Sequence, residues 1–277
     1  MTRKALKKTS SISLNTIKDN RVSIQFNLDG FSFCIYNTVS KKDIYFCEYV
    51  FENSQATPEN LLLEIEEIFK TDTYLQNDFT SVTVIHQNNL STLVPNPFFK
   101  EEELISYLNF NIKTLITDFI TFDDLDALNS KNIYVPYVNI NNYLFQNFGE
   151  FEYKHHSTVL IEKLLKVNKN KEKTMYVNTS KTTLDVVVLE NNKLLLSNTF
   201  SFNSKEDFIY YILFVAEQLN LDVNIFSLYF TGKITLTSDI YKTTYKYIKN
   251  VYFLESTNTI FNELKVPSHS NFILLGS

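Results

Sequence analysis

Residues 22–36 of the chain read VSIQFNLDGFSFCIY, two apolar runs joined by Asp29-Gly30. In residues 22–28 every second residue is apolar, which is the period of a strand with one buried face. Asp-Gly is a strong hairpin signal, because both central positions of a type I′ turn need a positive φ that Gly and Asp tolerate. The stretch therefore predicts two antiparallel strands, 22–28 and 31–36, that fold back through a two-residue turn.

The residues that follow extend this hairpin into a larger unit. Ile44–Phe51 predicts a third strand, and Thr57-Pro58-Glu59 predicts a helix start with Thr57 as N-cap. Ser81–Ile85 predicts a strand that pairs in parallel through a right-handed crossover, because a helix separates it from the third strand. Up to Gly149 the pattern adds a helix over 101–109, strands over 114–121 and 132–135, and a helix over 139–148.

The second half of the chain repeats this order of elements after a helix expected over 157–167. The repeat predicts strands over 174–178, 183–189 and 193–200, a helix that starts at the capping pattern Ser204 to Asp207, and a strand over 226–230. Matching positions differ by nearly constant offsets: 174 − 22 = 152, 204 − 58 = 146 and 226 − 81 = 145. We therefore predict an α/β fold of two duplicated βββαβ lobes, over 20–150 and 151–277, behind a flexible basic tail at 1–19.

Composition restricts the class of protein. With 277 residues and 44% apolar content, the chain can bury two cores of ordinary size. A net charge of −5 with only two arginines disfavours binding to a phosphate backbone, so we expect no nucleic-acid partner. No apolar run approaches the roughly 20 residues needed to cross a bilayer, and the N-terminus lacks the apolar core of a signal peptide, so we expect a cytoplasmic protein.

Two copies of three antiparallel strands, a helix and a parallel strand resemble the actin-like ATPase superfamily, whose lobes are ribonuclease H-like and which includes sugar kinases and heat-shock chaperones. The stretches LDGFSF (28–33) and DFIYYIL (207–213) resemble an uncharacterised bacterial family of that fold, domain of unknown function family 3822, in the branch of pilus-assembly ATPase homologues. The superfamily resemblance implies a nucleotide between the lobes, held by one hairpin from each copy and by a glycine-rich turn. It also implies carboxylates that hold Mg²⁺.

The first hairpin departs from the superfamily pattern. The superfamily has Asp and, two residues later, Gly, and these positions fall on Asn27 and Asp29, beside Gly30. An amide cannot supply the anionic charge that Mg²⁺ needs, and a carboxylate in the place of Gly would repel phosphate. We favour a plain hairpin turn for Asp29-Gly30.

The second hairpin and the late turn depart in the same way. Asn178 replaces the acid, and Thr179, Ser180, Lys181 and Thr182 stand where the superfamily has a glycine cluster and Thr. Two interpretations fit these hydroxyls and the lysine: an anion-binding site and a solvent-exposed turn. The turn is the commoner of the two. Asp185 falls on the outward parity of its strand and is expected at the surface. At the adenosine-contacting turn, Thr231-Gly232 keeps one glycine of the expected pair.

Other chemistries have less support. His155-His156, His86 and His269 lack the spacing of metal ligands, and we expect surface or packing histidines. Asp123-Asp124 is expected in a solvated loop. We therefore predict no catalytic residue and no metal ligand.

Three functions remain open. The first is a non-catalytic scaffold or regulator that binds an unidentified protein partner and needs no cofactor. The alternative is a nucleotide-binding or hydrolysing ATPase that holds ATP/Mg through Asp29, Lys181 and Thr182. The third is peripheral membrane assembly, with the basic tail or an aromatic patch meeting a partner. These sequence patterns do not indicate an oligomeric state.

Overall fold

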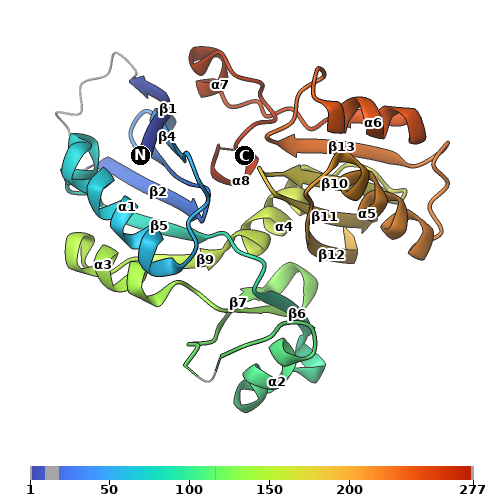
Figure 1. The fold of residues 1–277 in the computed structure, drawn as a ribbon, viewed down its shortest axis with the longest axis horizontal. Helices are drawn as coiled ribbons and strands as arrows, with labels where there is room; N and C mark the ends of the chain where they lie inside the picture. Colours follow the sequence, from blue (N-terminus) through green and yellow to red (C-terminus); the bar gives the residue numbers. More distant parts are fainter. Residues whose placement is uncertain (1, 10–18, 116, 276–277) are drawn as a thin grey trace. The chain divides into compact units, whose positions relative to one another are not determined.

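The computed structural model describes residues 2–9, 19–115 and 117–275. The chain divides into two compact units, Met1–Val159 (unit 1) and Leu160–Ser277 (unit 2) (Figure 1). This division falls later than the boundary expected after residue 150. The reason is β9 (Glu152–His155), which pairs in parallel with β5 (Ser81–His86) and so belongs to the sheet of unit 1.

Unit 1 is built on a six-stranded sheet with the order β1-β4-β3-β2-β5-β9. β2 (Asn20–Asn27), β3 (Gly30–Asn37) and β4 (Lys42–Phe51) are consecutive antiparallel strands, as the apolar alternation predicts. α1 (Pro58–Thr71) and η2 (Thr73–Gln76) lead from β4 to β5. β5 pairs in parallel with β2, because an intervening helix returns the chain to the same end of the sheet.

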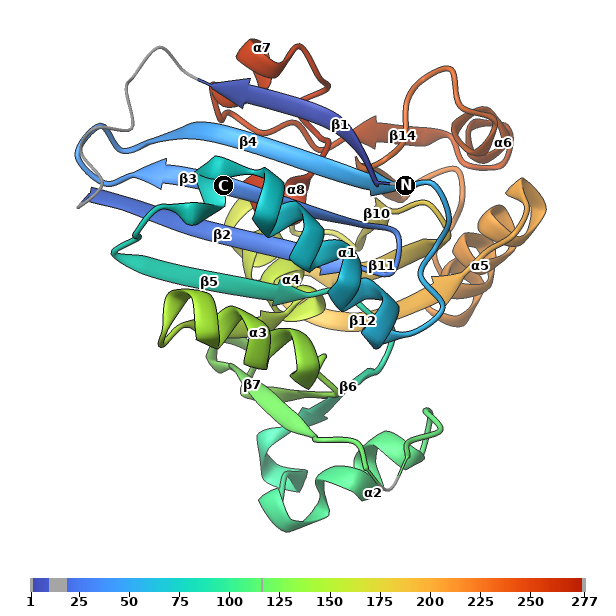
Figure 2. The same ribbon diagram turned by 60° about the vertical axis from the view of Figure 1, so that its left-hand side comes forward.

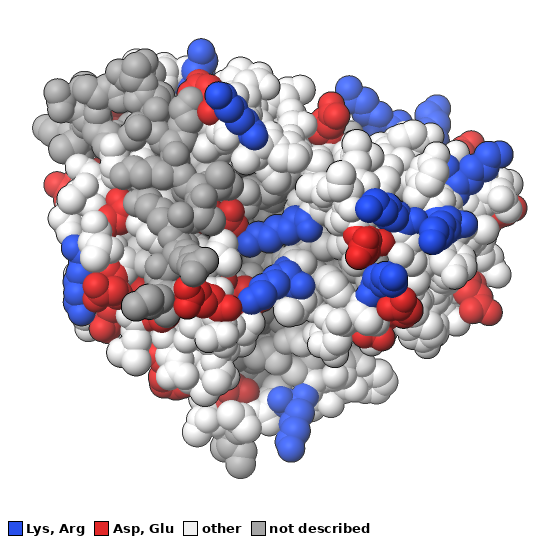
Figure 3. All heavy atoms as spheres, turned by 45° about the horizontal axis from the view of Figure 1, so that its top comes forward, with Lys and Arg blue, Asp and Glu red and all other residues white. Residues whose placement is uncertain are grey.

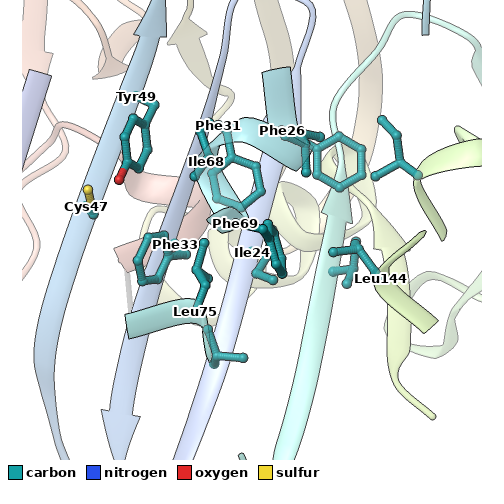
Figure 4. Close-up of a cluster of buried hydrophobic side chains, with 14 of the residues drawn as sticks. Ile24, Phe26, Phe31, Phe33, Cys47, Tyr49, Ile68, Phe69, Leu75 and Leu144 are labelled. Carbon is teal, nitrogen blue, oxygen red and sulfur yellow. The ribbon is translucent and has the colours of Figure 1, made fainter. Parts of the chain in front are cut away.

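The core of unit 1 lies between this sheet and two helices. α1 begins at the predicted place, with Asn60 N donating to Thr57 Oγ1 at 3.4 Å. α1 and α3 (Val138–Phe148) lie on the same face of the sheet (Figure 2). Figure 4 shows the apolar side chains that meet there, which come from strands, α1, η2 and α3 and include Ile24, Phe26, Phe31, Phe33, Ile68, Phe69, Leu75 and Leu144.

The N-terminal segment differs from the flexible tail that the sequence predicts. Thr2–Thr9 form β1, which pairs antiparallel with β4. An edge strand presents unpaired N–H and C=O groups, and backbone pairing with them needs no apolar pattern in the added strand. Residues 1 and 10–18 of the predicted tail (1–19) lie outside the described residues.

A second, three-stranded sheet of unit 1 has the order β6-β8-β7. We call residues 91–134 the insert. It contains β6 (Ser91–Pro95), η3 (Asn96–Phe98), η4 (Glu101–Glu103), α2 (Leu104–Asn109), β7 (Thr121–Leu125), η5 (Asp126–Leu128) and β8 (Ser130–Tyr134).

The insert corrects two predictions. The strand expected over 114–121 is wrong, since β7 only begins at Thr121. The loop expected at Asp123-Asp124 is wrong too, because both residues lie within β7 and Asp123 is buried. A buried carboxylate interrupts the apolar alternation from which strands are predicted.

Unit 2 repeats the architecture of the first sheet. α4 (His156–Val167) crosses the boundary between the units. The sheet has the order β12-β11-β10-β13-β14, and β13 pairs in parallel with β10 as β5 does with β2. Its predicted elements are present: β10 (Thr174–Thr179), β11 (Thr183–Glu190), β12 (Lys193–Ser201), α5 (Lys205–Gln218) and β13 (Ser227–Gly232).

The start of α5 is the predicted capping box, in which Asp207 N donates to Ser204 Oγ and Ser204 N donates to Asp207 Oδ2. The chain then continues through elements that periodicity did not reveal: α6 (Asp239–Tyr247), β14 (Asn250–Phe253), α7 (Ile260–Leu264) and α8 (Phe272–Leu275). Most of these are short, and short elements carry little periodic signal.

Two surface properties bear on the class of protein. Among the residues that the structure describes, no helix combines the length and the apolar character needed to span a membrane. On the face drawn in Figure 3, lysine and arginine side chains lie among aspartate and glutamate side chains, with broad uncharged areas between them.

Candidate functional site

The first candidate hairpin makes a tight turn, one residue earlier than predicted. β2 ends at Asn27 and β3 begins at Gly30, and these two residues pair across the strands. The loop is therefore Leu28-Asp29, closed by a hydrogen bond from Asp29 N to Asn27 Oδ1 at 2.8 Å. An Asx turn of this kind needs no positive φ, and none of these loop residues has one. The type I′ turn centred on Asp29-Gly30 is wrong.

Gly30 is instead needed for strand packing. A Cβ atom at this position would lie 2.6 Å from Tyr49 O on β4, closer than side-chain carbons approach a carbonyl. The glycine therefore permits the close approach of β3 and β4.

The Asn27 amide is used inside unit 1. Its Nδ2 donates to Gln87 Oε1 at 3.1 Å, and the same oxygen accepts from Gln25 Nε2 at 2.7 Å. The Asp29 carboxylate accepts a hydrogen bond from Ser54 Oγ. Asn27 and Asp29 thus lie in a polar network that closes the turn, and Gly30 begins the next strand.

In unit 2 the candidates Asn178 and Thr231 belong to a continuous hydrogen-bonded row across four strands. Thr231 on β13, Asn178 on β10, Asp185 on β11 and Thr199 on β12 are register partners in turn. Thr231 Oγ1 donates to Asn178 Oδ1 at 3.0 Å, and Asn178 Nδ2 donates to Asp185 Oδ2 at 2.8 Å. Thr199 Oγ1 then donates to Asp185 Oδ1 at 2.8 Å. We call these four residues the polar row.

The burial of Asp185 corrects its predicted place at the surface. Its exposed fraction is 3%, because β11 is an inner strand of the sheet and is covered on both faces along most of its length. Hydrogen bonds to both carboxylate oxygens make that burial possible. Sequence parity could not show this, because alternation marks a surface face only where one side of a sheet is open.

The loop between β10 and β11 carries the remaining candidates of this hairpin. Ser180, Lys181 and Thr182 form a short turn in which Ser180 N donates to Thr183 O at 2.8 Å. Lys181 and Thr182 are exposed, whereas Thr179 is buried at the end of β10. The structure therefore brings Asn178 and Thr179 beside Thr231 and Gly232, and leaves the other three on the adjoining turn.

Gly232 packs directly on β10. Its φ is +82°, and a Cβ atom there would overlap Thr179 O and lie 2.9 Å from Asn178 Oδ1. The neighbouring backbone groups are paired within the unit: Gly232 N donates to His269 O at 2.8 Å, and Lys233 N donates to Thr179 O at 2.6 Å. Glycine is required at this position for two reasons. A side chain would overlap β10, and the left-handed backbone disfavours residues that have a Cβ atom.

The four histidines that the sequence predicts at the surface or in packing roles, His86, His155, His156 and His269, are all buried. His86 is buried, accepts from Tyr137 N at its Nδ1 and donates from its Nε2 to Asn141 Oδ1. Burial lowers the pKa of His86 to about 4. The pKa of His155 is lowered by burial and by the neighbouring His156 and His86. In the ranges 2–9, 19–115 and 117–275 no group of three or more His, Cys, Asp or Glu side chains is placed to hold a metal ion.

A buried network that sequence reasoning missed surrounds Asp123. Asp123 Oδ2 accepts from His155 N at 2.8 Å and from Thr158 Oγ1 at 2.6 Å, and Asp123 Oδ1 accepts from Tyr134 OH at 3.0 Å. His155 Nδ1 in turn accepts from Ser157 Oγ at 2.7 Å. The network joins the insert to the start of α4. Burial raises the pKa of Asp123, although these donors act against the rise.

Comparison with known proteins identifies the fold and the family. The chain matches the family described as protein of unknown function (DUF3822) over residues 9–251. A protein of Bacteroides thetaiotaomicron with an actin-like ATPase fold and unknown function is similar at 24% identity and a TM-score of 0.80, over 95% of this chain and 97% of that one. No curated protein matches.

Two more distant structures share the fold. The PilM–PilN type IV pilus biogenesis complex matches at 10% identity and a TM-score of 0.53, over 85% of this chain and 88% of that one. The ethanolamine utilization protein EutJ of Carboxydothermus hydrogenoformans matches at 6% identity and a TM-score of 0.50, over 94% and 93%. The duplicated α/β architecture is thus that of the actin-like ATPases, and the chain belongs to the family of proteins of unknown function DUF3822.

Proposed function

We propose that this protein is a non-catalytic member of the actin-like fold, a scaffold or regulator that acts by binding another protein in the cytoplasm. One observation carries the proposal. At both positions where the resemblance calls for a magnesium-holding acid, the chain has an asparagine whose amide is hydrogen-bonded inside its own unit.

Phosphoryl transfer depends on positioning and on neutralising charge, and Mg²⁺ takes carboxylate, phosphate and water oxygens as ligands. The amides of Asn27 and Asn178 are neutral. The nearby acid of unit 2, Asp185, accepts hydrogen bonds at both oxygens. A magnesium–triphosphate group at this row would compete with these hydrogen bonds. The two-residue turn after Asn27 also has too little backbone to wrap a phosphate.

Nucleotide binding tests the proposal directly. A ligand that binds only the folded state raises the melting temperature by mass action, so millimolar Mg-ATP and Mg-GTP should be titrated in thermal-shift and calorimetric measurements. We expect no shift and no heat of binding. A melting temperature that rises with nucleotide, and rises less in Lys181→Ala and Thr182→Ala, would replace the scaffold proposal with the ATP/Mg alternative. The exposed variant Lys246→Ala serves as the control.

The scaffold proposal carries two further expectations. The low arginine content argues against nucleic acid as the partner. Binding to vesicles of phosphatidylcholine and phosphatidylglycerol, measured by sedimentation, would favour the peripheral-membrane function over a protein-binding scaffold.

A further inference from the structure

The insert exposes several large apolar side chains. Phe98, Phe110, Leu115 and Phe119 are 71%, 88%, 62% and 54% exposed. We call these four residues the insert patch. The core beneath them is small, with Val94, Leu108, Ile133 and Val135 as its buried members. Isolated exposed apolar residues are ordinary, but a group of aromatic ones on a small subdomain marks an interaction surface.

Contacts within the insert place the patch residues in one neighbourhood. Tyr107 OH donates to Phe98 O at 2.5 Å, and Phe110 follows Tyr107 by one helical turn. Thr114 Oγ1 donates to Asn109 Oδ1, which holds the segment that contains Leu115 beside the end of α2.

A second contact relates Leu115 to Phe119. Leu115 N donates to Asp118 Oδ2 at 2.8 Å, and Phe119 is the next residue along the chain. In both ribbon views α2 lies at the end of unit 1 opposite β1 (Figures 1 and 2).

The charge around the patch indicates which kind of partner can bind there. Between residues 98 and 119 the chain carries Lys100 and Lys113 against Glu101, Glu102, Glu103 and Asp118, a formal charge of 2 − 4 = −2. Glu101, Glu102 and Glu103 are exposed and stand between Phe98 and α2. Apposed like charges disfavour a second copy of this surface, and they also disfavour an anionic lipid surface.

We propose that the insert patch docks a basic amphipathic segment of another protein. The aromatic side chains take the apolar face of that segment, and Glu101–Glu103 face its lysines or arginines. Aromatic anchors with a polar, charged rim are the usual anatomy of a protein interface. The proposal rests on the scaffold function for its biological role, and it names the surface and the chemistry of the partner.

The test uses a fluorescein-labelled peptide with leucine on one helix face and lysine on the other, titrated with the full chain and followed by fluorescence anisotropy. We expect binding that weakens about tenfold or more in the double variant Phe98→Ser/Phe110→Ser, as for interface anchors. Glu101→Lys/Glu102→Lys should weaken it as well. Circular dichroism checks that each variant is folded, which is expected because the side chains are exposed.

Matched controls come from the other unit and from the peptide. Tyr210→Ser/Phe214→Ser removes two exposed aromatic residues of α5 and should leave binding unchanged. A peptide with glutamate in place of lysine should bind at least about tenfold more weakly, because its charge repels that of the patch. Equal affinity of the wild type and the Phe98→Ser/Phe110→Ser variant, or of the two peptides, would overturn the proposal.

Two other binding partners, a second copy of the chain and a lipid membrane, are tested by separate measurements. A dimer in sedimentation velocity that dissociates in Phe98→Ser/Phe110→Ser, or binding to phosphatidylcholine vesicles that this variant loses, would reassign the patch and overturn the proposal. Nucleotide binding in the earlier test would contradict the scaffold function and leave the peptide result standing. Absence of peptide binding without nucleotide binding would sink only the docking proposal.

Discussion

Asn178 on β10 lies directly opposite Asp185 on β11, and Asn178 Nδ2 donates to Asp185 Oδ2 at 2.8 Å. The amide stands where the resemblance places an acid. Both side chains are buried, and the pair consists of one carboxylate and one neutral amide that donates to it.

Asn178→Asp should destabilise the protein at neutral pH. Two buried carboxylates would face each other, and we expect the free energy of unfolding to fall by about 3 kcal/mol. One carboxyl of the pair should then have a raised pKa, so stability should recover as the pH falls and it takes up a proton. Urea denaturation at several pH values measures this.

The exchange Asn178→Asp/Asp185→Asn is the matched control. It keeps one carboxylate and one amide in the pair and should recover most of the lost stability. If the double variant is as unstable as the single one at neutral pH, charge pairing in the polar row is not the cause of the loss.

Gly232→Ala should cost about 3 kcal/mol, because the added Cβ overlaps Thr179 O and the backbone φ is +82°. Gly149→Ala isolates the contribution of backbone strain: its φ is +73°, but nothing lies within 4 Å of the added Cβ. We expect a smaller loss there, about 2 kcal/mol, because the backbone (ψ −139°) is strained for a side chain but no atom is overlapped. Equal losses in chemical denaturation would show that packing against β10 contributes nothing.

Asp123→Ala should destabilise unit 1 by about 3 kcal/mol or more, since it leaves His155 N, Thr158 Oγ1 and Tyr134 OH without their acceptor. The neighbouring Asp124 has a side chain that is 53% exposed and pairs with Lys131, so Asp124→Ala should change stability by less than about 1 kcal/mol. Thermal unfolding of the two variants compares a buried network with a surface pair on the same strand. Similar melting temperatures would contradict the structural role of Asp123.

The buried histidines predict acid sensitivity. His86 has a pKa of about 4 when folded, against 6.5 for an ordinary imidazole. Between these values the unfolded chain binds a proton that the folded chain does not. The free energy of unfolding should therefore fall as the pH drops from about 6.5 to about 4, by on the order of 3 kcal/mol from this residue, and change no further from this cause below that range.

His86→Gln removes the titration and keeps both a donor and an acceptor. Its stability should fall less steeply over the same pH range in urea denaturation. The exposed variant Lys181→Gln should keep the wild-type slope. An unchanged slope in His86→Gln would mean that the folded state protonates this position as easily as the unfolded chain does.

The amino-acid sequence by itself determined the order of elements and the duplication. Apolar alternation in residues 22–28, the N-cap at Thr57 and the capping box at Ser204 are local signals, because each depends on residues within one strand or one helical turn. The replacement of acids by Asn27 and Asn178 is likewise visible without coordinates.

Tertiary structure alone decided which polar residues are buried and what they contact. Asp185 and Asp123 look like surface acids in sequence, but their donors come from distant positions such as Thr199, Tyr134 and Thr158. Strand register brings these groups within hydrogen-bond distance, and register depends on how whole sheets pair. The burial of a charge can be understood only when all of its partners are in place, and that condition belongs to the folded chain.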